Sequence, residues 1–141
     1  MARQILIRCN TDLTLSQATE KIERLLNVKC ELRNTSYGDS FVFSCMGLDG
    51  AIYCAPIEAH VEDRRLESFS TVIDVGLYAS PLGKAHDEFD ALHNIALFIA
   101  GIVARHLEWP SFICSEENNV MDEVSLPDDD EDYDWNSGTQ Y

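Results

Sequence analysis

The residues SFSTVIDVGLY (68–78) carry the clearest structural signal in the chain, because their side chains alternate between two faces. A period of two residues is typical of a β-strand with one face on a hydrophobic core. The residues of the expected core face are Phe69, Thr71, Ile73, Val75 and Leu77. We therefore expect a sheet to form the framework of the fold, and we interpret the flanking segments relative to it.

Toward the N-terminus, RQILIRC (3–9) shows the same alternation and predicts a first strand. The segment TLSQATEKIERLLN (14–27) has an apolar residue at every third or fourth position, which predicts a helix over residues 15–27. Thr14 followed by Gln17 forms the capping-box pattern that begins such a helix.

Short strands are predicted next, over residues 28–33 and at FVFSCM (41–46). The residues GLDG (47–50) then suggest a hairpin connection into AIYCAPIEAH (51–60). Pro56 inside this last run favours an edge strand or a bulge over a central strand, because proline lacks a backbone N–H.

After residue 78, a long helix is expected from Asp87 to about Leu107, and SFIC (111–114) suggests a final strand. The most apolar stretch, IALFIAGIVA (95–104), has only ten residues, so we assign it to a buried helix and not to a membrane span. The order strand, helix, four strands, helix, strand predicts an α+β fold. We expect a single antiparallel sheet of five or six strands with both helices mainly on one face. One domain should cover residues 1–115, followed by an acidic extension over residues 116–141.

Charge is the unusual property of the composition, with a formal net charge of −15. Residues 1–115 carry 10 basic and 15 acidic side chains, whereas residues 116–141 carry 10 acidic side chains and no Lys or Arg. Such a field repels nucleic-acid phosphates and anionic lipid headgroups, and it attracts basic proteins. We therefore expect a basic protein partner, with neither direct nucleic-acid binding nor membrane binding.

The N-terminal residues MARQILIRCN lack the long apolar core and small-residue cleavage site of a signal peptide. The five cysteines are an odd number at irregular spacing, without a Cys-x-x-Cys pair. These features predict a cytosolic protein with reduced thiols. Cys30, Cys45 and Cys54 fall at strand positions that should face inward, as small core residues.

Two groups of residues have the chemistry of an active or metal site. Glu58 and His60 are two residues apart on the expected strand, so they would point the same way and could act as an acid–base pair. His86, Asp90 and His93 have the spacing of one helical face and could bind zinc. Neither a nucleophile nor a phosphate-binding loop accompanies the first group, and the second lacks a fourth ligand. We therefore predict neither an enzyme nor a cofactor or metal site.

The C-terminal residues combine charge with aromatic side chains. Tyr133 and Trp135 lie within an acidic run, and aromatic residues surrounded by charges are typical of interface hot spots. We predict that this run binds the partner through Asp128, Asp129, Asp130, Glu131, Asp132, Tyr133, Asp134 and Trp135.

In size, in charge and in lacking enzymatic motifs, the chain resembles the immunity proteins of bacterial polymorphic-toxin systems. These include the proteins paired with contact-dependent growth-inhibition toxins. The resemblance implies a cytosolic antitoxin that binds a basic, nuclease-type toxin domain and covers its active site. Its carboxylates would take the place of substrate phosphates.

Two other functions are compatible with the sequence. An acidic secretion chaperone would share the length and charge, and it would need an exposed apolar groove for an effector segment. A small enzyme would use Glu58 with His60, or His86 with Asp90 and His93. The oligomeric state, monomer or homodimer, stays open.

Overall fold

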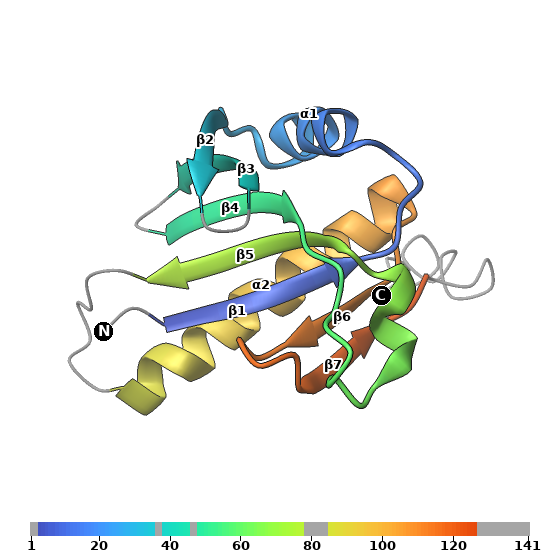
Figure 1. The fold of residues 1–141 in the computed structure, drawn as a ribbon. Helices are drawn as coiled ribbons and strands as arrows, with labels where there is room; N and C mark the ends of the chain where they lie inside the picture. The colour runs from blue at the N-terminus through green and yellow to red at the C-terminus, as the bar shows by residue number, and fades with distance from the viewer. Residues whose placement is uncertain (1–2, 36–37, 46–47, 78–84, 127–141) are drawn as a thin grey trace, which may run out of the picture.

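A seven-stranded antiparallel sheet with two helices forms the fold, as seen in a computed structural model (Figure 1). The structure describes residues 3–35, 38–45, 48–77 and 85–126. The strand order across the sheet is β2-β3-β4-β5-β1-β6-β7. The elements in chain order are β1 (Arg3–Cys9), α1 (Leu15–Leu26), β2 (Glu31–Thr35), β3 (Gly38–Cys45), β4 (Leu48–Cys54), the 3₁₀ helix η1 (Arg64–Ser68), β5 (Thr71–Leu77), α2 (Ala85–Leu107), β6 (Ser111–Cys114) and β7 (Val120–Val124). The predicted α+β class is confirmed, although the sheet is larger than expected.

The expected strand at residues 68–78 is β5, which lies at the centre of the sheet between β4 and β1. Ile73 and Val75 face the helices, as the alternation predicts, and are fully or almost fully buried. The intervening Val72 is buried as well, because a second layer covers part of the opposite face, and Asp74 on that face is only 6% exposed. The alternation thus placed Ile73 and Val75 correctly, but Phe69 precedes β5 and packs in the opposite layer against Phe112. This second covered face was not predicted.

Both helices pack on the same face of the sheet, as predicted. Ala18 and Ile22 of α1, together with Leu92, Ala96 and Val103 of α2, are fully buried against that face. The capping box is confirmed, since Gln17 N donates to Thr14 Oγ1 and Thr14 N donates to Gln17 Oε1. Within the described ranges, no helix is both long enough and apolar enough to span a lipid bilayer.

The opposite face of the sheet is covered in part by residues 55–70, which run from β4 to β5 and include η1 (Figure 1). Val61 and Leu66 of this segment are buried against Val72 and Phe112 of the sheet. Complete burial of a leucine such as Leu66 stabilises the fold by about 2 kcal/mol. The covering segment is therefore held by its own small core and not only by polar contacts.

Two expectations about the segment after GLDG are wrong. β4 is a central strand between β3 and β5, and it ends at Cys54, two residues before Pro56. Pro56 therefore lies beyond the end of β4. Its missing backbone N–H does not interrupt the pairing of a central strand, and it does not mark an edge strand. Cys54, at that strand end, is exposed and not inward-facing.

The other cysteines are buried or half-buried, and within the described ranges all are free thiols. Cys30 and Cys45 pack against the helix-side core, as predicted. Burial raises the pKa of Cys9 to about 12 and that of Cys114 to about 11, so both stay protonated at neutral pH. These cysteines act as small apolar residues.

Residues 120–124, which we assigned to the acidic extension, form β7 and pair with β6 at the edge of the sheet. The pairing shifts by one residue between Ile113 and Cys114, a β-bulge that breaks the regular register. The sheet thus continues beyond residue 115, and acidic residues of the C-terminal region belong to its last strand.

Candidate functional site

The predicted partner-binding residues of the C-terminal run lie outside the described residues. They are Asp128, Asp129, Asp130, Glu131, Asp132, Tyr133, Asp134 and Trp135. The structure describes the chain up to Leu126, immediately after β7. The acidic run begins two residues further along the sequence, at Asp128.

Glu58 and His60 lie side by side, as predicted, with His60 Nδ1 3.2 Å from Glu58 Oε2. We expected them on a strand, but they belong to the irregular segment after β4. About three quarters of each side chain is exposed, 77% for Glu58 and 76% for His60. The two residues therefore form an exposed pair on the surface of the protein.

Of the candidate zinc ligands on the expected helical face, the structure describes the side chains of Asp90 and His93. His93 lies 2.7 Å from Asp122 of β7, measured from Nε2 to Oδ2, and Asp90 is exposed. The side chain of His86 lies outside the described residues. Among the side chains that the structure does describe, no three His, Cys, Asp or Glu residues come together as metal ligands. The contact of His93 with Asp122 instead ties α2 to the edge strand.

Arg8 of β1, which the sequence analysis did not single out, fastens the covering segment to the sheet. Only 3% of the residue is exposed, and its Nη1 donates to the carbonyl oxygens of Ala55 at 2.7 Å and Phe69 at 3.1 Å. Its Nε donates to Asn118 Oδ1 at 2.7 Å. Desolvation by burial lowers the pKa of Arg8. The guanidinium thus joins both ends of residues 55–70 to the turn before β7.

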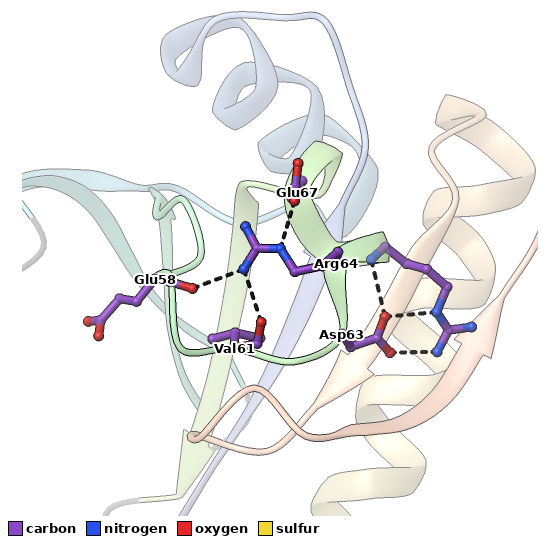
Figure 2. A network of polar contacts seen from close by, with 6 residues as sticks. Glu58, Val61, Asp63, Arg64 and Glu67 are labelled. Carbon is purple, nitrogen blue, oxygen red and sulfur yellow. Dashed lines mark hydrogen bonds and ion pairs between the residues drawn. The ribbon is translucent and has the colours of Figure 1, made fainter.

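The covering segment is also braced from within (Figure 2). Arg64 donates through Nη1 to the carbonyl oxygens of Glu58 and Val61, and its Nε lies 2.7 Å from Glu67 Oε1. Asp63 caps η1 by accepting a hydrogen bond from the backbone N–H of Arg65. The side chain of Arg65 donates to the same carboxylate and so lowers the pKa of Asp63.

Acidic side chains are concentrated on residues 55–70 and 115–126, which we call the acidic face. These two segments carry eight Asp or Glu side chains and two arginines. Arg65 connects the two segments. Its Nη1 lies 3.7 Å from Glu123 Oε2 of β7, and its Cζ lies 4.9 Å from the centroid of the Phe112 ring. Both arginines are already paired with carboxylates of the same face. On the acidic face, three exposed carboxylates have no ion-pair partner among the described residues. They are those of Glu62, Glu116 and Glu117.

A hollow of about 450 Å³ lies beside the covering segment, on the part of the sheet that the segment leaves open. Its lining includes Gly76 of β5 and Ala51 of β4, which have little or no side chain. Gln4 and Asp49 pair with Gly76 from either side, so that their side chains form two of the walls. The hollow follows from small residues in the middle of a wide sheet.

Asp74 lines this hollow and is 6% exposed. Its Oδ2 accepts hydrogen bonds from the hydroxyl of Tyr53 at 3.0 Å and from Gln4 Nε2 at 3.5 Å. Burial raises the pKa of Asp74 to about 6, the Tyr53 hydrogen bond opposes this shift, and the charge of Glu116 adds to it. Asp74 was not predicted as a site residue from the sequence. The one available signal was a single carboxylate between apolar residues in the strongest strand.

Comparison with families of known proteins, with curated proteins and with solved structures gave no match. The function is therefore inferred from the structure alone, in which two features stand out. One is the acidic face, and the other is the hollow that Asp74 lines. They lie close together, because Leu6 pairs with Asp74 on one side and with Cys114, two residues before Glu116, on the other.

Proposed function

We propose that this protein is an immunity protein that acts in the cytosol by binding a cationic, nuclease-type toxin domain and covering its active site. The proposal rests on one observation, the acidic face. Its two arginines are already paired, and Glu62, Glu116 and Glu117 are exposed without an ion-pair partner among the described residues.

The position of the acidic face relative to the end of the chain supports the same function. β7 carries Asp122 and Glu123, and the sequence has six more acidic residues between Asp128 and Asp134. Carboxylates arranged in this way steer a cationic domain into contact and oppose the positive groups that would otherwise hold substrate phosphates. Tyr133 and Trp135 would supply the apolar contacts that hold the complex together.

A chain that ends at Leu126 should lose most of its affinity for the partner. This truncation keeps β7 intact, so the sheet and the acidic face should stay folded. It removes six carboxylates and two aromatic anchors, and loss of such an anchor alone costs about 2 kcal/mol or more. We expect the dissociation constant to rise at least about thirtyfold. Titration calorimetry with the partner, which can be isolated on the immobilised full chain at low salt, measures this.

The matched control keeps the length of the chain and all its carboxylates. Replacing Tyr133 and Trp135 by alanine tests the anchors alone, and it should reproduce a large part of the loss. Protection of cells that express the toxin gives a second readout. If the chain ending at Leu126 protects cells and binds with unchanged affinity, the C-terminal run is not part of the interface.

One observation favours the secretion chaperone as a second candidate. Phe98 on the outer side of α2 is 69% exposed, which is unusual for a large aromatic side chain. A chaperone would use such an apolar surface for an extended effector segment. Binding of an unfolded segment that is abolished by Phe98→Ser, with no binding of a folded cationic domain, would favour this function instead.

A further inference from the structure

The hollow beside the acidic face has the shape and charge of a receptor for one side chain. We propose that it receives the guanidinium group of an arginine from the cationic partner, with Asp74 and Asp49 as its acceptors. The identity of the partner rests on the proposed function, whereas the guanidinium site is argued from the hollow itself.

The shape of the hollow follows from the register of three strands. Gly76 lies between its cross-strand partners Gln4 and Asp49, and Ala51 lies opposite Asp74 in the next row on the same face. The large side chains in these rows surround two positions that have almost none. A sheet face that exposes a glycine next to an alanine leaves the backbone open to close approach by a ligand.

Asp74 has an acceptor that the protein leaves unused. Both hydrogen bonds to its carboxylate reach Oδ2, and Oδ1 accepts none from the described residues. Oδ1 is also accessible to solvent. Among the described residues, the side-chain atoms that are fully buried without a hydrogen-bond partner are Thr19 Oγ1 and Ser111 Oγ, and Asp74 Oδ1 is not one of them. A buried carboxylate that keeps one oxygen open toward a hollow offers a desolvated acceptor, where charge-assisted hydrogen bonds are strongest.

Asp49 supplies the second acceptor. It lies diagonally across the strand pair from Asp74, and diagonal neighbours are about 7–8 Å apart, within the span of a planar guanidinium and its five donors. Ser44 donates to Asp49 Oδ1 at 3.2 Å, and no side chain or backbone group of the described residues donates to Oδ2. Two carboxylates that flank one opening suit arginine better than lysine, since the guanidinium can donate in two directions within one plane.

The cations that line the hollow leave its acidic groups available. Arg33 is engaged with Glu31, with its Nη2 3.2 Å from Glu31 Oε2. Lys29 is exposed, and its long side chain can turn into solvent without breaking a described contact. Asp74 and Asp49 are therefore the lining carboxylates that have no ion-pair partner among the described residues.

The test uses blocked amino acids as probes, so that no partner is needed. The isotopically labelled full chain is titrated with acetyl-arginine methylamide and followed by amide chemical shifts. We expect saturable shifts centred on Ala51 and Gly76. Acetyl-citrulline methylamide, which has the same shape without the charge, should cause no saturable shift there. Equal shifts with the citrulline probe, or shifts confined to the acidic face, would overturn the inference.

Two variants with the same change of charge separate the hollow from the acidic face. Asp74→Asn should weaken binding of the arginine probe about tenfold or more, because it removes a charge-assisted bond. Glu117→Gln should leave this binding unchanged. Equal effects of the two variants would contradict a specific site.

The outcome also separates this inference from the proposed function. If the arginine probe does not bind in the hollow but truncation at Leu126 still abolishes partner binding, the hollow is not the receptor and the proposed function stands. If the probe binds and no cationic domain does, the site stands and the proposed function is wrong.

Discussion

Replacing Arg8 by methionine should lower the free energy of unfolding by about 3 kcal/mol, which is a large fraction of the stability of a small domain. Methionine keeps most of the apolar stem but donates no hydrogen bond. The carbonyl oxygens of Ala55 and Phe69 and the amide oxygen of Asn118 would lose their donors. Relief of the desolvated charge offsets only part of this cost. Urea unfolding at neutral pH measures the change.

Arg24→Met is the matched control for Arg8. Arg24 is also in the first quarter of the chain, but its side chain is 77% exposed and pairs only with Glu20, one turn earlier in α1. Its loss should change stability by less than about 0.5 kcal/mol. If the Arg8 variant is as stable as the Arg24 variant, the guanidinium does not hold residues 55–70 to the sheet.

The second large effect is a gain of stability. Asp74→Asn should raise the free energy of unfolding at pH 7.5 by about 3 kcal/mol, because Asp74 carries a buried charge that is desolvated in the folded protein. Its pKa is about 6 in the fold and starts from 3.8, so the folded protein binds this proton more tightly. The associated stability is fully present at low pH and is lost as the pH rises through 6.

The gain from Asp74→Asn should therefore depend on pH. It should be complete above pH 7 and fall to roughly half by pH 5, where the wild-type carboxyl is largely protonated in the fold. Asp63→Asn is the control with the opposite sign. The hydrogen bond from Arg65 lowers the pKa of Asp63, so that variant should be less stable than the wild type at neutral pH. A gain for Asp74→Asn that is the same at pH 5 and pH 7.5 would show that its charge is not the cause.

The architecture was largely predictable because most elements have a strong local signal. β5 and β1 alternate, α1 has a capping box, and α2 has a long apolar stripe. β7 was missed because VMDEV carries two acidic residues in five and lies on an edge, where pairing depends on backbone hydrogen bonds. The central position of β4 was missed because Pro56 was taken to lie within the strand.

The site was less predictable, since its residues depend on contacts distant in the sequence. Arg8 and Asp74 are charged residues in the two central strands, and alternation places both on a face that should be wet. Arg8 is buried because residues 55–70 fold back over that face, and Asp74 is buried beside Tyr53 and Gln4 of the neighbouring strands. No local sequence pattern indicates either contact. Glu58 and His60 are in contact as predicted, because residues two apart in the sequence are close in space in most backbone conformations.

The most direct test of the account is the affinity for the cationic partner when charges of the acidic face are reversed. The double variant Glu62→Lys with Glu117→Lys changes two exposed residues without an ion-pair partner among those described, and Asp12→Lys with Asp39→Lys changes net charge equally elsewhere. We expect the first variant to bind at least about tenfold more weakly than the second, with a difference that shrinks in high salt as screening increases. Equal affinities of the two variants at every salt concentration would contradict an interface on the acidic face.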